Sequence, residues 1–193
     1  MFGTRVVVAD ADVVFRKKLK EILSQAGYLV VGEVGDGRSA LKVVFQNEPD
    51  LVIMDSQLPG LRSLEVAGII EEHRAAPVIL LASEHELEVL DEDGASRILG
   101  YLVKPVCETS LIPVLEIAIA NFRKMLKLEQ ENKKLKETLE ARRVVEKAKG
   151  ILMRGKNLSE EDAYRHLRKQ SMDRCIPMAR VAKELIAKAE GKT

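Results

Sequence analysis

Three carboxylates and one lysine directly follow short apolar runs in the first half of the chain. Asp10 and Asp12 come after "RVVVA", Asp55 closes "LVIMD", and Lys104 follows "YLV". Clustered carboxylates are ligands that suit Mg²⁺, and a nearby lysine suits a phosphoryl group. A single Asp at such a place is usually a turn or helix cap. The joint pattern instead predicts a pocket for phosphoryl transfer.

These side chains need a framework that brings separate strand ends together. Five short apolar runs have the character of strands and alternate with segments of helical spacing: 5–10, 29–34, 51–55, 78–82 and 101–103. Such alternation predicts an α/β fold, a five-stranded parallel sheet that is doubly wound, with helices on both faces. If the first and third strands are neighbours, Asp10, Asp12 and Asp55 share one pocket at the switch point of the sheet. The helix expected around "HELEVLDEDGAS" is the weakest of the series.

The formal net charge of +1 conceals an asymmetry between two parts of the 193-residue chain. Residues 1–122 carry 11 Lys and Arg against 19 Asp and Glu, whereas residues 123–193 carry 20 against 11. This asymmetry indicates a basic module for nucleic acid or a membrane surface, attached to an acidic partner domain. No apolar stretch approaches the ~18 residues of a membrane span. No secretory signal precedes the first strand, so we expect a cytoplasmic protein without membrane contact.

A long helix is expected to begin at Thr109-Ser110 and to run without an obvious stop to Gly155. Its middle carries a heptad-like seam with spacings of four, three and four residues: Leu128, Asn132, Leu135 and Leu139. Asn132 falls where a parallel two-stranded coiled coil often buries an Asn that fixes register and partner number. The seam predicts a homodimer. Because only about two heptads are clear, a single amphipathic linker helix is the alternative.

From Ala141 onward the sequence predicts a small all-α domain of three helices. The first ends near Gly155, Ser159 caps the second, and Pro177 opens the third. Apolar positions at helical spacing are expected to form its core: Val144, Val145, Ala148, Ile151, Leu152, Ala163, Leu167, Met172, Met178, Val181, Ala182, Leu185 and Ile186. The polar remainder is strongly basic, as a surface that holds a phosphate backbone would be, although such faces are commonly only solvated.

Residues 4–121 resemble the receiver domain of two-component response regulators. The resemblance rests on the acidic residues after the first strand, on "D-x-x-L-P-G" from Asp55, and on "Y-L-V-K-P" around Lys104. It implies a flavodoxin-like fold in which Asp55 accepts a phosphoryl group from a sensor histidine kinase. Mg²⁺ would be held by Asp10, Asp12 and Asp55. Lys104 matches the lysine that pairs with the acyl phosphate, and Tyr101 matches the aromatic switch residue.

The pocket departs from the family pattern at three places. Ala11 occupies the position of the direct metal-binding carboxylate, and Ala82 replaces a Ser or Thr at the end of the fourth strand. Arg62-Ser63 stands where Asp-Gly is usual. A site that binds Mg²⁺ through so few carboxylates should lose much of its affinity with one of them. We therefore expect slow phosphorylation of Asp55 unless Asp12 compensates.

Residues 141–189 closely resemble an ANTAR domain, the RNA-binding module of transcription antiterminators. The matching stretches are "EKAKGILM", "SEEDAYRHLR" and "SMDR" followed by "PMARVA", in the family's order and spacing. The resemblance implies a dimer that binds paired stem-loops in nascent leader RNA and prevents an overlapping terminator from forming. Together with the basic surface, it gives these expected RNA-binding positions: Arg143, Lys147, Ala148, Lys149, Gly150, Arg154, Tyr164, Arg168 and Ser171.

The expected organisation is a receiver domain over 1–121, a coiled-coil linker over 122–140 and an ANTAR domain over 141–193. We expect a response regulator that acts as an antiterminator and catalyses nothing beyond its own phosphorylation. One alternative is a DNA-binding regulator, which the helix continuing from the coiled coil disfavours. The other is a phosphorylation-independent scaffold or sequestration partner, which Ala11 and Ala82 favour.

Overall fold

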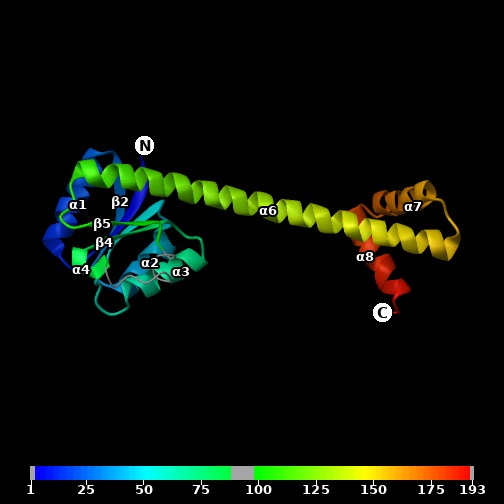
Figure 1. Ribbon diagram of the computed structural model, residues 1–193, viewed down its shortest axis with the longest axis horizontal. Coiled ribbons are helices and arrows are strands. Elements are labelled where there is room, and N and C mark those ends of the chain that lie inside the picture. The colour runs from blue at the N-terminus through cyan, green and yellow to red at the C-terminus, as the bar shows by residue number, and fades with distance from the viewer. Residues whose placement is uncertain (1–2, 88–97, 192–193) are drawn as a thin grey trace. The chain divides into compact units, whose positions relative to one another are not determined.

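The computed structural model describes residues 3–87 and 98–191 (Figure 1). The chain divides into two compact units, residues 1–127 and 128–193. The first contains the sheet and most of the helices, and the second consists of helices alone. Within the described ranges, no helix combines the length and the apolar character that crossing a membrane requires.

Five parallel strands form the centre of the first unit, in the order β2-β1-β3-β4-β5. Their bounds are β1 (Thr4–Ala9), β2 (Tyr28–Val34), β3 (Leu51–Asp55), β4 (Val78–Ala82) and β5 (Gly100–Val103). The predicted adjacency of the first and third strands is confirmed, with Ala9 opposite Met54. Every residue of β4, and every residue of β3 before Asp55, is buried, as strands covered on both faces require.

Helices cover both faces of the sheet and give it two hydrophobic cores. On one face lie α1 (Val13–Gln25) and the beginning of α6 (Glu108–Lys156), and on the other lie α2 (Gly37–Asn47) and α3 (Ser63–Glu72). Successive strand residues point to opposite faces, so alternate residues of β1, β3 and β4 enter different cores. This arrangement confirms the expected doubly wound fold. Helix α4 spans Glu84–Leu87, and the rest of the expected fourth helix lies outside the described residues.

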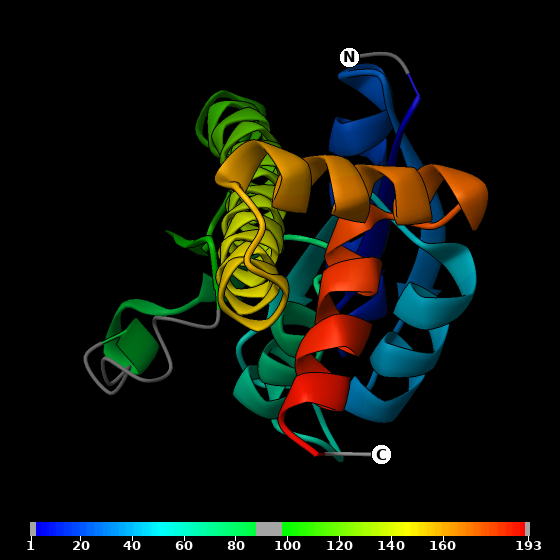
Figure 2. The ribbon, with the colours of Figure 1, turned by 90° about the vertical axis from the view of Figure 1, so that its right-hand side faces the viewer.

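The second unit has a core of its own. The end of α6, a continuous helix of 49 residues, packs with α7 (Glu160–Asp173) and α8 (Met178–Ala189), as Figure 2 shows. Ser159 caps α7 as predicted, and its Oγ accepts a hydrogen bond from the Asp162 N–H at 3.1 Å. The expectation that Met172 is in the core is wrong, because this side chain is 66% exposed. Met172 follows the buried Leu167 by five residues, which turns it about 140° around the helix.

Candidate functional site

Three charged side chains meet at the carboxyl edge of the sheet. Asp10 directly follows β1, Asp55 ends β3 and Lys104 directly follows β5. The Lys104 Nζ lies 2.7 Å from the Asp10 Oδ2 and 3.1 Å from the Asp55 Oδ1. Only 2% of the Asp10 side chain and 16% of the Asp55 side chain are exposed. The sheet order therefore brings these three predicted residues into one cluster.

The lysine compensates the charge of two buried carboxylates. Burial raises the pKa of Asp55, and the charge of Asp10 adds to this effect, while the hydrogen bond from Lys104 partly opposes it. For Lys104, burial alone would lower the pKa, but hydrogen bonds to Asp10 and Asp55 outweigh it and raise the pKa above its ordinary value. The Lys104 ammonium also lies 4.5 Å from the centre of the Phe15 ring. Lys104 thus stays protonated beside Asp55 and keeps a positive charge at this edge of the sheet.

Asp12, the third predicted carboxylate, is used differently. Its Oδ1 accepts hydrogen bonds from the N–H groups of Val14 at 2.8 Å and Phe15 at 3.2 Å, so it caps α1. Its own N–H donates to the Asp10 Oδ1 at 2.8 Å. Among the described residues, no group of three or more His, Cys, Asp or Glu side chains is arranged to hold a metal ion. Two carboxylates bound to one lysine, with Ala11 beside them, fit Mg²⁺ poorly.

Ser63, which stands where the family usually has Gly, fixes the loop after Asp55. The buried Ser63 hydroxyl donates to the Asp55 carbonyl oxygen at 2.6 Å and accepts from the Leu58 N–H at 3.3 Å. The Gly37 N–H donates to the Pro59 carbonyl oxygen at 3.2 Å, which ties the same loop to α2. The sequence signal for Ser63 was its place in the turn after Asp55, but its hydrogen bonds depend on the folded loop.

Glu86 is a second residue that sequence reasoning missed. Its Oε2 accepts hydrogen bonds from the Ser56 hydroxyl and from the Ser83 N–H, each at 2.7 Å. The hydrogen bond from Ser56 is the main reason that the pKa of Glu86 lies below its ordinary value. Ala82 supplies no hydroxyl at the end of β4, so Ser56 is the hydroxyl next to Asp55 along the chain. Tyr101, the predicted switch residue, is 53% exposed on β5.

In the second unit, the structure divides the predicted RNA-binding positions into two groups. Ala148 is fully buried, which confirms its predicted place in the core and leaves its side chain off the surface that RNA could contact. The Ser171 hydroxyl donates to the Ile176 carbonyl oxygen at 2.6 Å and closes the turn between α7 and α8. The Lys147 ammonium lies 2.6 Å from the Glu190 Oε1, and Lys149 is paired with two glutamates described below. The remaining positions are accessible to solvent. Gly150 is half-buried, and the other four are exposed: Arg143, Arg154, Tyr164 and Arg168.

The fold and the pocket define a receiver-type α/β unit joined to a small basic helical unit. Two family models match the chain, "Response regulator receiver domain" over residues 6–116 and "ANTAR domain" over residues 133–186. The chain is 36% identical over 182 residues to the transcriptional regulatory protein PdtaR of Mycobacterium tuberculosis. The aligned region covers 94% of this chain and 89% of PdtaR. The chain therefore belongs to the family of response regulators that carry an ANTAR domain.

Solved structures agree with the fold of the first unit. A response regulator receiver domain protein from Clostridium thermocellum matches with a TM-score of 0.58 at 24% identity, covering 64% of this chain and 98% of that one. The receiver domain of the response regulator NarL from Mycobacterium tuberculosis matches with a TM-score of 0.55 at 25% identity, with the same coverage.

Proposed function

We propose that this chain is a transcription antiterminator that binds paired stem-loops of a nascent leader RNA as a homodimer. The observation that carries the proposal is the outward face of α6 around Gly150. Arg143, Gly150 and Arg154 are spaced seven and four residues apart, so they share one side of the helix. A Cβ atom added to Gly150 would meet no heavy atom within 4 Å outside the helix backbone.

The glycine at position 150 of α6 is best explained by a partner molecule that contacts the helix there. Glycine inside a helix costs about 1 kcal/mol relative to alanine. Because no packing around Gly150 in the described chain requires the smallest residue, we infer that a partner approaches the α6 backbone closely there. Arg143 and Arg154 on the same side favour a polyanion, since guanidinium groups bind phosphate through paired hydrogen bonds.

Helix α7 adds groups that suit the unpaired bases of a hairpin loop. Tyr164 and Arg168 are exposed and lie one helical turn apart. Aromatic rings and guanidinium planes stack on bases that are splayed out of a loop, which is how proteins commonly read RNA sequence. Tyr164 is the only Phe, Tyr or Trp after Phe122, so this unit lacks the row of rings that a platform for long single strands uses.

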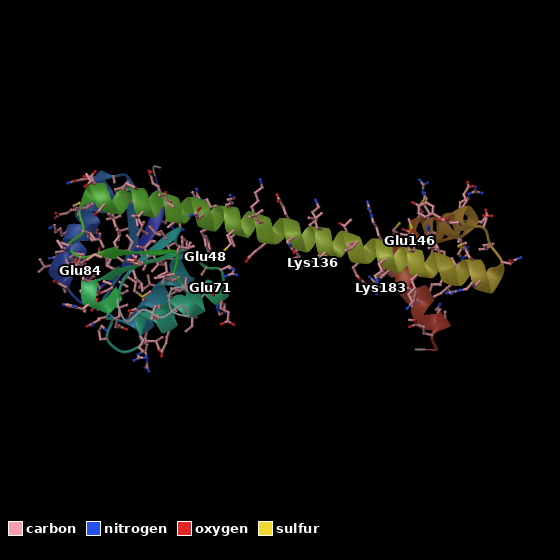
Figure 3. The ribbon with its side chains drawn as sticks, viewed as in Figure 1. Glu48, Glu71, Glu84, Lys136, Glu146 and Lys183 are labelled. Carbon is pink, nitrogen blue, oxygen red and sulfur yellow. The ribbon has the colours of Figure 1, made fainter. Side chains whose placement is uncertain are left out.

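The predicted seam of Leu128, Asn132, Leu135 and Leu139 supports the homodimer part of the proposal. Residues 127–140 of α6 are all exposed, and Figure 3 shows Lys136 on this stretch. Leu128, Leu135 and Leu139 are 54%, 69% and 70% exposed. Three leucines on one side of a helix gain from removal of their apolar surface from water, at roughly 25 cal/mol per Å². A second copy of α6 would cover them and would pair Asn132 with its own equivalent.

Charged residues beside the seam favour a parallel pair of helices in register. With Asn132 at an a position, Lys124 and Glu131 are g residues, while Glu129 and Lys136 are e residues. In a parallel coiled coil, each g residue faces the e residue five positions further along the other helix. Lys124 would then face Glu129, and Glu131 would face Lys136, so both contacts join opposite charges. An antiparallel pair would place Asn132 opposite an apolar residue instead.

The proposal is tested by binding to three nucleic acids at the same salt concentration. They are a leader RNA with two hairpins, the same RNA with one hairpin removed, and duplex DNA. We expect the two-hairpin RNA to bind most tightly, because a dimer that engages both hairpins gains from effective concentration. Transcription in vitro through a leader with an overlapping terminator should give more read-through product when the protein is added.

Two results would contradict the proposal. Equal affinity for the one-hairpin and two-hairpin RNAs would leave the dimer without a role in recognition. Tighter binding to duplex DNA than to either RNA would favour a DNA-binding regulator. Gly150→Ala provides a matched test of the interface, since a Cβ atom at this position meets no other heavy atom within 4 Å outside the helix backbone. It should preserve the fold and weaken RNA binding.

A further inference from the structure

Lys149 is almost completely buried, which is unusual for a lysine. Only 10% of its side chain is exposed. It follows Ala148 and precedes Leu152, two residues of the second unit's core. Lysine is rarely buried to this extent unless its charge is paired. The role of Lys149 therefore depends on which groups pair with its ammonium.

Two glutamates hold the Lys149 ammonium. Its Nζ lies 2.8 Å from the Glu146 Oε1 and 2.8 Å from the Glu160 Oε1. Glu146 is three residues earlier on α6, whereas Glu160 is the first residue of α7. The hydrogen bonds that Lys149 donates to Glu146 and Glu160 raise its pKa above the ordinary value. One ammonium donor therefore joins α6 to the start of α7 through Glu160, and a second is used within α6 by Glu146.

Glu160 is well placed to receive this contact. It belongs to the first turn of α7, where a negative charge is favoured by the helix dipole. Ser159 caps the same turn, and the Ala163 N–H donates to the Ser159 carbonyl oxygen at 2.9 Å. Lys149 lowers the pKa of Glu160, so the glutamate stays ionised in the pair. The position of this turn sets where the rest of α7 begins.

The same two glutamates make Lys149 a poor partner for a phosphate. Glu146 and Glu160 side chains are 65% and 70% exposed, so a phosphate that approached Lys149 would meet both carboxylates. Two negative charges around one positive charge repel a further anion. Arg154 on α6 is exposed and has no such carboxylates among the described ion pairs.

We propose that Lys149 is a positioning residue that holds the first turn of α7 against α6 and so fixes where Tyr164 and Arg168 lie, without contacting RNA itself. The RNA part of this inference rests on the proposed function. The ion pairs and the burial of Lys149 do not depend on it.

The first test measures hydrogen exchange of the α7 amides in the full chain without RNA. Lys149→Met keeps most of the apolar stem and removes the charge, and Lys149→Arg keeps the charge. We expect Lys149→Met to speed exchange of the amides of residues 163–168 by roughly fivefold, between the effects of exposed and buried ion pairs. Lys149→Arg should restore most of the protection. Unchanged exchange in Lys149→Met would overturn the positioning role.

The second test uses the salt dependence of hairpin RNA binding. A lysine that neutralises a phosphate contributes about one unit to the slope of log affinity against log salt. We expect Lys149→Met to weaken binding with the slope unchanged, and Arg154→Ala, the control, to reduce the slope. Glu160→Gln distinguishes a positioning role of Lys149 from a phosphate contact, because the two roles change RNA affinity in opposite directions. It should weaken binding if Lys149 positions α7, and strengthen it if Lys149 contacts phosphate.

A smaller slope for Lys149→Met, or tighter binding by Glu160→Gln, would overturn the inference. If the unaltered protein bound no hairpin RNA, the proposed function would fail, but hydrogen exchange would still decide whether Lys149 positions α7.

Discussion

Ala11 is the single residue that most limits how the pocket beside Asp55 can hold Mg²⁺. Asp10 and Asp55 are both paired with Lys104, and Asp12 caps α1, so each of the three predicted metal-binding carboxylates already has another partner. We expect Ala11→Asp to raise Mg²⁺ affinity by about tenfold, or ~1.4 kcal/mol. It should also speed labelling of Asp55 by a small phosphodonor, measured by intact-protein mass spectrometry.

Ala11→Asn is the matched control, because it adds a similar volume without the charge and should change labelling much less. Rapid and stoichiometric labelling of the unaltered protein at millimolar Mg²⁺ would contradict this prediction. It would mean that Asp12 leaves the α1 cap to bind the metal.

Cys107 is an exposed free thiol whose pKa is about 7. The hydroxyl of Ser110 contributes most to this, and Thr109, whose Oγ1 lies 3.1 Å from the Sγ, contributes next. Because the thiolate is the reactive form, alkylation of Cys107 should rise through a midpoint near pH 7 in a Cys175→Ser background. Ser110→Ala should move the midpoint to higher pH. A midpoint near the ordinary thiol value of 9.0 in the unaltered residue would refute the assignment.

At the scale of the helix, Asn132 sets the register of the proposed coiled coil. We expect Asn132→Leu to stabilise association while allowing other registers and partner numbers, since a buried Asn gives up stability to specify both. Sedimentation equilibrium should find dimers for the unaltered chain and a mixture of species for the variant. Monomers at all concentrations in the unaltered chain would instead support the single linker helix.

Charge reversal gives an independent control on helix direction. Glu131→Lys alone should weaken a parallel dimer, because it would face Lys136, and Glu131→Lys with Lys136→Glu should recover the loss. Each such pair is exposed, so the effect should be roughly 0.2–1 kcal/mol.

At the scale of the whole molecule, charge separates the two units. The excess of Lys and Arg lies in residues 123–193, and that part has its own core. RNA binding should therefore survive removal of residues 1–110 and should fall steeply with salt. Titrations of both forms at several salt concentrations should give similar slopes. A much smaller slope in the shortened chain would place phosphate contacts in the first unit.

Periodicity and strand-end chemistry were enough to predict the five strands, the adjacency of β1 and β3, and the meeting of Asp10, Asp55 and Lys104. These features follow from local apolar patterns and from the rule that ligand sites form at the carboxyl ends of parallel strands. The expected linker over 122–140 stays a prediction.

Other outcomes depended on contacts that sequence spacing does not contain. Basic residues look alike in a sequence, yet Lys149 is enclosed by glutamates and Arg154 is not. The hydroxyl of Ser63 likewise acquires its role only when the loop after Asp55 folds. Met172 is apolar but lies five residues after the buried Leu167, which places it outside the buried stripe of α7.

Helix α6 contributes Leu111, Leu115 and Ile119 to the core of the first unit, and Val144, Ala148 and Leu152 to the core of the second. One uninterrupted helix thus belongs to both cores. An inserted residue turns everything after it by 100°, so changes of chain length in the exposed stretch 127–140 alter the phase of the seam. Insertions of seven residues nearly preserve this phase, and those of two or five invert it. If the seam forms a coiled coil, the length of this stretch can therefore change only in steps that keep the leucines in phase.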